Sequence, residues 1–369
     1  MNKRLVLAAG LLAGTIIGAG IFSLPYIVGR LGVWLGLFYL AVFALVYFLI
    51  HFMYAQLVLE EGPGHNSFHL ADKYFSKPTR VLSDIVILGE LAITLTIYLI
   101  LAPAFMNLFL GFGGSTTLLI FWVIGSVLIF IKLDWLGRAE SLDVFCILAV
   151  VLILAGASGF DFGNVPALPR AADWSLWLLP FGPLLFALSG RPAIAKVVEE
   201  YRRAESEGAG FSLKRAVAWG TFVPAILYAV FAVAVLAVNP LVHEDTITGL
   251  GLSPVLAAAL GILGFITVWT SYSMIGLNLH EIFVQDLKWP KRVSGLLVVL
   301  LPMALYLLGF RDFLGAIGIA GGLFLALEGI FIITMWRRAF KESRWFLPAG
   351  FLYIVFLASI AYQAVKFIL

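Results

Sequence analysis

Long apolar runs separated by short polar segments recur along the whole chain. The runs are continuously apolar and lack the two-residue alternation of barrel strands, which predicts helices. A membrane core about 30 Å thick is crossed by about 20 residues of helix, and most of the runs reach this length. We therefore predict an all-α integral membrane protein with about eleven transmembrane helices, at residues 5–30, 33–59, 81–110, 117–132, 136–159, 174–200, 213–239, 254–285, 292–309, 312–336 and 346–367.

The composition supports a membrane protein. Hydrophobic residues make up 62% of the 369 residues and charged residues only 12%, whereas soluble domains average roughly 45–50% and about 25%. So few charges exclude a soluble enzyme, a secreted disulfide scaffold and a disordered chain, and they make the lipid bilayer the expected surroundings. Cys146 is the one cysteine of the sequence, so it can form no internal disulfide. The net charge is +3 without a basic block, and no nucleic-acid partner is predicted.

The positions of the basic residues predict how the helices are oriented. With the N-terminus in the cytoplasm, 20 of the 24 lysines and arginines, Arg191 among them, lie on the cytoplasmic side. Basic residues collect on that side of membrane proteins. We therefore predict a multi-pass protein of the cell inner (plasma) membrane, with a cytoplasmic N-terminus and, after an odd number of spans, an outside C-terminus. The basic residues predicted on the outer side are Arg30, Arg170, Arg311 and Lys366.

Two of the predicted spans are interrupted close to mid-membrane. Span one contains GAGIFSLP at residues 18–25, which begins roughly 21 Å along the helix, and span six contains FALSGRP at residues 186–192 at a similar depth. Unpaired backbone at that depth is tolerated only where it lines a cavity or is buried in protein. Paired breaks of this kind indicate the midplane substrate site of a secondary transporter. The alternative is that the small residues only allow close helix packing.

The spacing of the two interrupted spans predicts an internal symmetry. Spans one and six are five apart, so they cross the membrane in opposite directions. This favours an inverted repeat of five plus five helices, with the eleventh helix as an addition. We predict a single transmembrane transporter domain over residues 1–369, with repeat one at about 5–159, repeat two at about 174–336 and the extra helix at about 346–367.

The polarity of the breaks indicates a class of ligand. Released N–H groups around Gly18, Ala19 and Gly20, beside the N-terminus of a half-helix, favour a carboxylate. Released carbonyl groups around Ala187 and Leu188, at the end of the outer half of span six, favour an ammonium group. A ligand that carries both charges a short distance apart is an α-amino acid.

Three motifs carry a family resemblance: GTIIGAGIFSLPY in span one, FALSGRPAIAKVVEEYRR in span six and TVWTSYSMIGLNLHEIFVQDL in span eight. They resemble the amino acid/auxin permease type transporters, and most of all the bacterial hydroxy- and aromatic-amino-acid permeases of the amino acid-polyamine-organocation superfamily. The resemblance covers essentially the whole chain and implies the leucine-transporter type of fold and cation-coupled amino acid uptake. Part of the superfamily carries a span-five lysine for proton coupling, but the corresponding stretch here, LDVFCILAVVLILAG, has none.

The resemblance also implies which residues contact the substrate. Residues 18–21 correspond to the break that binds the carboxylate, and Tyr98 reaches the same group from span three. The aromatic rings of Phe186 and Trp269 bound the pocket for the substrate side chain. The complete predicted substrate-binding set is Gly18, Ala19, Gly20, Ile21, Tyr98, Phe186, Ala187, Leu188, Ser189 and Gly190.

A cation site is implied near the middle of span eight. Thr270 and Ser271 lie where sodium-coupled relatives place hydroxyl ligands, facing the start of the span-one break. The resemblance thus implies a cation-binding site formed by Gly18, Thr270 and Ser271. The alternative is that these hydroxyls bond to the carbonyl groups of the preceding helical turn.

Two acidic residues, Glu90 in span three and Glu328 in span ten, lie well inside predicted spans. A charge at the centre of a span costs roughly 2.5–3.5 kcal/mol on insertion scales, so each is a candidate for proton coupling. The alternative is a hydrogen-bonded carboxyl group that locks its helix to a neighbour. His51, late in span two, is interpreted as a packing histidine with satisfied hydrogen bonds.

Together these features predict a secondary active transporter that imports neutral L-amino acids (aromatic, hydroxylated or small) by cation-coupled symport and alternating access. The coupling ion is H⁺ or Na⁺, and neither a cofactor nor a metal is predicted. The alternatives are a facilitative channel or exchanger for small zwitterions, and an intramembrane enzyme. The enzyme is disfavoured because the sequence has no clustered nucleophile and base, no G-x-S-x-G elbow and no Walker motif. The sequence indicates no protein partner.

Overall fold

The computed structural model describes residues 2–62, 67–130, 136–159, 163, 165–167, 174–341 and 346–368. Within these residues the chain forms helices and no strand, which confirms the predicted all-α class. The helices of the first half are α1 (Lys3–Ile16), η1 (Ala19–Ser23), α2 (Leu24–Leu31), α3 (Val33–Glu61), α4 (Ser67–Tyr74), α5 (Lys77–Leu110), α6 (Ser115–Phe130) and α7 (Leu136–Ala157).

The second half continues in the same way, and two of its long helices contain π-helical turns, η3 and η4. Such turns widen the helix locally and are frequent at functional sites. The helices of this half are η2 (Trp174–Trp177), α8 (Phe181–Ala187), α9 (Arg191–Ser206), α10 (Leu213–Val238), α11 (Pro254–Glu281), η3 (Ile282–Asp286), α12 (Lys291–Leu307), α13 (Phe313–Ile319), η4 (Ala320–Leu325), α14 (Ala326–Ala339) and α15 (Phe346–Ile368).

Polar caps and prolines mark where several helices begin. The Asn2 side chain accepts a hydrogen bond from the Arg4 N–H at 3.0 Å at the start of α1, which satisfies one of the donors that a helix N-terminus leaves unpaired. Pro25, Pro192 and Pro254 lie in the first turns of α2, α9 and α11. A proline is tolerated there because its missing N–H would have no partner within the helix.

Most of the predicted spans are long, apolar helices. Seven helices are long and apolar enough to cross a membrane, and α1 together with η1 and α2 forms a bent pair that makes an eighth. The predicted spans 117–132, 136–159 and 292–309 correspond to helices α6, α7 and α12, which are not among these candidate spans. Residues 131 and 132 lie outside the described residues. The count of eleven therefore stays a prediction.

Large apolar side chains cover the outside of the helix bundle. Trp34, Leu152 and Val255 are each more than 70% exposed. Soluble monomers rarely expose extensive apolar surface, and so much of it indicates a surface covered by another apolar medium. The outer surface of the bundle is therefore suited to lipid, as the composition predicts.

The centre of the bundle is an aromatic cluster next to η1. Phe22 packs edge to face against Phe105 of α5 at 4.8 Å between ring centroids, and against Phe231 of α10 at 5.7 Å. All three side chains are fully buried. Edge-to-face pairs are the favoured arrangement of aromatic rings, so these contacts hold η1 firmly between α5 and α10.

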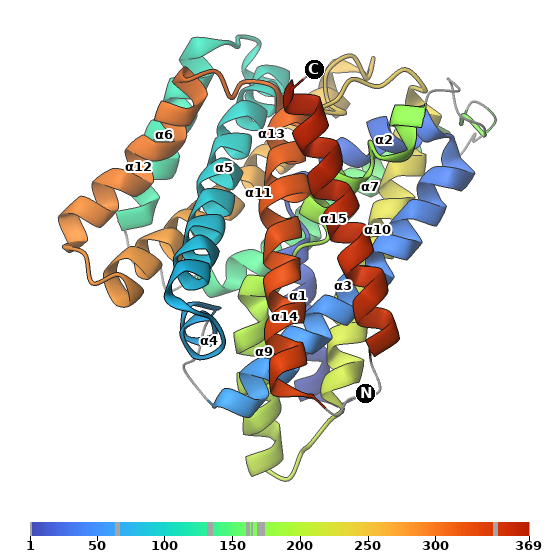
Figure 1. Ribbon diagram of the computed structural model, residues 1–369. Coiled ribbons are helices and arrows are strands. Elements are labelled where there is room, and N and C mark those ends of the chain that lie inside the picture. The colour runs from blue at the N-terminus through green and yellow to red at the C-terminus, as the bar shows by residue number, and fades with distance from the viewer. Residues whose placement is uncertain are drawn as a thin grey trace.

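The two ends of the chain lie at opposite ends of the bundle (Figure 1). This agrees with the predicted odd number of crossings. The α15 helix lies against α14 on the outside of the bundle, and the division into two repeats and an added helix stays a prediction. Arg170 lies outside the described residues, and the cytoplasmic location of the N-terminus stays a prediction.

Candidate functional site

The first predicted break lies between α1 and η1. Helix α1 ends at Ile16, and the Ile17 N–H donates to the Ala13 carbonyl at 3.0 Å. Gly18 is then extended, with φ −156° and ψ −160°, before η1 begins at Ala19. The chain bends by 50° here. Helical hydrogen bonding is therefore interrupted where the glycine spacing predicted it.

The second predicted break lies between α8 and α9. Helix α8 ends at Ala187 and α9 begins at Arg191. Gly190 lies between them with φ −140° and ψ 16°, and its N–H donates to Nε2 of His51 at 3.1 Å. A histidine of α3 thus takes the place of the helical carbonyl that this N–H lacks.

The two breaks touch each other backbone to backbone. A Cβ atom added at Gly20 would lie 2.5 Å from Ala187 Cα and 2.9 Å from Ala187 Cβ. Only a hydrogen atom fits between them, so this approach requires glycine. The neighbouring predicted substrate residues Ala19, Ile21 and Leu188 are buried in the same contact region.

Tyr228 of α10 joins the ends of the two interrupted helices. Its hydroxyl donates to the Ile16 carbonyl at 2.6 Å and is 3.1 Å from the Ala187 carbonyl. Carbonyl groups at helix ends have no partner within the helix, and here one hydroxyl proton is shared by two of them. The tyrosine is fully buried. Sequence analysis missed it, although a tyrosine in an apolar run of span seven signals a hydroxyl that needs a partner.

The predicted aromatic residues lie around the breaks. The Tyr98 hydroxyl would be 3.5 Å from a Cβ atom on Gly18, so it is next to the predicted carboxylate site. Phe186 is buried in the last turn of α8. Trp269 of α11 stacks on Phe265, with ring centroids 6.3 Å apart. The substrate contacts of these residues stay a prediction.

Thr270, one of the predicted cation ligands, makes hydrogen bonds within its own helix. The Thr270 hydroxyl lies 2.9 Å from the Ile266 carbonyl and 3.0 Å from the Thr267 carbonyl. Hydroxyl groups in membrane helices commonly donate to carbonyls of the preceding turn in this way. Helix α11 packs against η1, which is the arrangement that a site with Gly18 requires. The roles of Thr270 and Ser271 as cation ligands stay a prediction.

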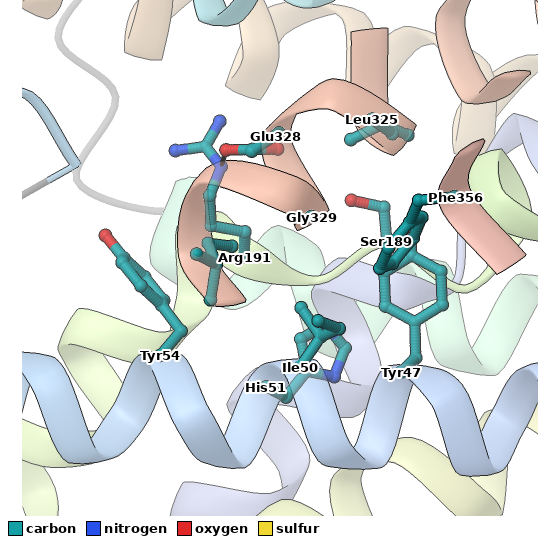
Figure 2. A pocket seen from close by; sticks show the side chains of 11 residues that line it. Tyr47, Ile50, His51, Tyr54, Ser189, Arg191, Leu325, Glu328, Gly329 and Phe356 are labelled. Carbon is teal, nitrogen blue, oxygen red and sulfur yellow. Dashed lines mark ion pairs between the residues drawn. The ribbon is translucent and has the colours of Figure 1, made fainter. Parts of the chain in front are cut away.

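The two acidic candidates meet at one arginine. Arg191 forms an ion pair with Glu328 through its Nε atom (Figure 2), and its guanidinium lies 3.9 Å from Glu90. The Thr94 hydroxyl donates to the other Glu90 oxygen at 3.0 Å. Glutamates predicted in separate spans are thus joined across α5, α9 and α14.

The Arg191 side chain is buried between two glutamates. The positive-inside count placed it among the residues of the cytoplasmic side, but its side chain is only 11% exposed between two glutamates. A buried arginine requires such partners because an unpaired charge in a low-dielectric interior is very costly. Its position directly after the Gly190 break was the signal that could have identified it.

A small cavity lies beside this ion cluster. Its volume is about 10 Å³, which is the lower limit for one water molecule. His51 lines it and is satisfied as predicted, because Nδ1 lies 3.1 Å from the Thr221 hydroxyl and Nε2 accepts from Gly190. The lining residues are Tyr47, Ile50, His51, Tyr54, Ser189, Arg191, Leu325, Glu328, Gly329, Ile332 and Phe356 (Figure 2).

Ion pairs tie the first helix to α9 at the end of the bundle that carries the N-terminus. Arg4 contacts Glu200 at 2.9 Å and Glu207 at 2.7 Å, and the Asn2 side chain donates to the Ala209 carbonyl at 2.7 Å. Helix α1 of one interrupted span and helix α9 of the other are therefore held together at this end of the bundle. Among the described residues, no three His, Cys, Asp or Glu side chains are grouped as a metal site.

Residues 4–368 match the family described as transmembrane amino acid transporter protein. The chain belongs to this family. It is 27% identical over 352 residues to the tyrosine-specific transport system 1 of Haemophilus influenzae, covering 88% of this chain and 85% of that protein. The predicted resemblance is therefore confirmed, and the chain is a membrane transporter rather than an enzyme.

Solved structures show the same fold. MhsT in complex with L-phenylalanine has a TM-score of 0.62 at 14% identity and is matched over 100% of this chain and 98% of its own. Mhp1, a nucleobase-cation-symport-1 family transporter in a closed conformation with bromovinylhydantoin bound, has a TM-score of 0.61 at 14% identity. The match covers 97% of this chain and 91% of Mhp1. A manganese transporter of Eremococcus coleocola has a TM-score of 0.60 at 16% identity, and the match covers 99% of this chain and 88% of that transporter. The fold is thus of the predicted leucine-transporter type.

Proposed function

We propose that this family member imports a neutral L-amino acid by cation-coupled symport and alternating access. One observation carries the proposal: two helices are interrupted at the same place, and their free ends meet around the Tyr228 hydroxyl. Broken helices that face each other in this fold type are where a secondary transporter binds its substrate. The inner membrane and the cytoplasmic N-terminus predicted from the basic residues belong to the same proposal.

The dipoles of the broken helices match an amino acid in zwitterionic form. The start of η1 presents N–H groups to a carboxylate, and Tyr98 adds a hydroxyl beside Gly18. The carbonyl groups of Ile16 and Ala187 end two helices, where the dipole is negative and favours an ammonium group. An ammonium group has three donors, whereas Tyr228 offers one to the same two carbonyls. Substrate binding would therefore give both carbonyl groups a hydrogen-bond donor.

An aromatic amino acid is the substrate class that we propose. The relative with 27% identity is named for tyrosine transport, and MhsT binds L-phenylalanine within the same fold. Phe22 and Phe186 lie at the breaks from η1 and α8, and aromatic faces pair well with an aromatic ring. Hydroxylated and small neutral amino acids are the other members of the predicted class.

The breaks must separate for a substrate to enter. Gly20 and Ala187 are in backbone contact, and the cavity beside the ion cluster has room for about one water molecule. The Arg4 ion pairs join α1 to the end of α9 at the end of the bundle that carries the N-terminus, and we infer that they help to keep that end closed. We infer a cycle in which the half-helices move apart toward one side of the membrane at a time, with H⁺ or Na⁺ as the coupling ion.

Two measurements test the proposal. Purified protein is heated with L-tyrosine, L-phenylalanine, L-serine, L-alanine or D-phenylalanine, with and without Na⁺ and at two pH values. We expect thermal stabilisation by the aromatic L-amino acids and little by the D-isomer. In proteoliposomes, accumulation of the stabilising amino acid above the outside concentration distinguishes an active transporter from a channel. Uptake that stops at equal concentrations under every ion gradient would contradict symport.

A further inference from the structure

We propose that Glu90, Arg191 and Glu328 form a buried proton-binding site whose occupancy controls the position of α9. The proposal rests on the transport function above and deepens it, because it names the proton as the coupling ion and gives the proton a place. It follows from charge and geometry in the ion cluster rather than from the substrate site.

The three side chains come from three different helices. Glu90 lies on α5, Arg191 on α9 and Glu328 on α14. Their side chains are 11%, 11% and 7% exposed. The cluster therefore connects the inner half of a broken span to two continuous helices, and it does so away from bulk water.

The charges of the cluster do not balance. One guanidinium faces two carboxyl groups. The other titratable groups that face them come from α3: Tyr47 donates to the Leu185 carbonyl at 2.5 Å, and Tyr54 lines the same cavity. Phenols are uncharged at neutral pH.

The histidine of this region adds no positive charge either. His51 Nε2 accepts a hydrogen bond from a backbone N–H, which a doubly protonated imidazole cannot do. With both glutamates ionised, the cluster would carry one uncompensated negative charge in the membrane interior, at a cost of several kcal/mol. One proton removes that charge.

The geometry indicates which carboxyl group takes the proton. Glu328 is in direct ion-pair contact with Arg191, so its charge is compensated. Glu90 lies 3.9 Å from the guanidinium, too far for a hydrogen bond, and its other oxygen accepts only the Thr94 hydroxyl within α5. In this arrangement the proton belongs on Glu90.

Loss of that proton would act directly on the broken helix. An ionised Glu90 attracts the guanidinium away from Glu328, and Arg191 is the first residue of α9. The preceding residue, Gly190, belongs to the break, and its N–H donates to His51. The small cavity lined by Ser189, Arg191 and Glu328 has room for about one water molecule between the break and the Glu328 carboxyl group. Proton binding and movement of α9 are therefore coupled through the Arg191 side chain.

The test compares Glu90→Gln with wild type in proteoliposomes. Glutamine keeps the shape of a protonated glutamate but cannot release a proton. A gradient of about one pH unit corresponds to about tenfold accumulation for one-to-one symport. We expect wild type to approach this value without Na⁺, and E90Q to lose the pH-driven accumulation while exchange of labelled for unlabelled amino acid stays measurable. Glu281→Gln, at an exposed acid, is the matched control and should accumulate like wild type.

Three outcomes decide the proposal. Loss of pH-driven accumulation in E90Q but not in E281Q supports it. Accumulation by E90Q equal to wild type, or wild-type accumulation driven only by Na⁺, overturns it while leaving amino acid transport intact. If E90Q does not fold, Glu90→Ala replaces it, and pH-driven accumulation by E90A equal to wild type overturns the proposal. A wild type that binds no amino acid contradicts the proposed function instead.

Discussion

Replacing Gly20 by alanine should prevent the two broken helices from closing on each other. The new Cβ atom would lie 2.5 Å from Ala187 Cα, about 0.9 Å inside the 3.4 Å at which ordinary van der Waals contact begins. The atom in its way is backbone, so no side-chain rotation relieves the overlap. Overpacking of this kind costs about 1–3 kcal/mol, which lowers the population of the closed arrangement about 5- to 150-fold.

Two other glycines near the breaks provide matched comparisons. A Cβ atom on Gly190 would approach Ile16 Cγ1 at 2.6 Å and Leu12 Cδ1 at 2.7 Å, and both atoms belong to side chains, which can shift more easily than backbone. A Cβ atom on Gly10 of α1 meets nothing within 4 Å, and alanine is the better helix former by about 1 kcal/mol. The expected order of damage is therefore G20A, then G190A, with G10A harmless.

The assay is the initial rate of L-tyrosine uptake into proteoliposomes, with folding checked by thermal unfolding and size-exclusion chromatography. Because alternating access passes through the closed arrangement in every cycle, we expect G20A to fold and to transport about 5- to 150-fold more slowly than G10A. Uptake by G20A at the G10A rate would refute the contact between the breaks. Equal loss in G190A and G20A would refute the distinction between backbone and side-chain obstacles.

Three further substitutions test the rest of the site. Tyr228→Phe leaves two buried carbonyl groups without their shared donor, which costs about 1–3 kcal/mol. We expect a lower unfolding temperature, and a larger stabilisation by substrate because its ammonium group can donate to the same carbonyls. The double variant Thr270→Val with Ser271→Ala should keep pH-driven uptake if the proton is the coupling ion, whereas loss of a Na⁺-stimulated component would favour the sodium site. Arg4→Gln removes the ion pairs at the end that carries the N-terminus. In that variant, a cysteine introduced at Ser189 should react faster with a maleimide added from that side. An unchanged labelling rate would show that these pairs do not hold that end closed.

The breaks could be predicted from sequence because their cause is local. Glycines at 18, 20 and 190 and the nearby prolines weaken a helix regardless of what surrounds it, and spans one and six contain such residues at equal depth. The membrane class followed from composition, and the family from three motifs. These features depend on residue type and spacing alone.

The partners of the breaks could not be predicted because they depend on tertiary contacts. Tyr228 and His51 are single polar residues in apolar spans, and only the packing of α10 and α3 against the breaks gives them their hydrogen bonds. Arg191 follows an apolar run, as residues at a membrane surface do, and its burial depends on Glu90 and Glu328 from distant helices. Sequence analysis found both glutamates as isolated candidates and missed the arginine that joins them.

The backbone contact between Gly20 and Ala187 has a consequence for the kinetics of substrate binding. A protein whose binding-competent form is a minor population has an apparent dissociation constant larger than the intrinsic one by the inverse of that fraction. Association that waits for such a rearrangement is slower than the roughly 10⁵–10⁷ M⁻¹s⁻¹ typical of preformed sites. At saturating concentration, ligands of different size should therefore enter at one common rate, set by the opening of the helices, and differ mainly in how long they remain bound.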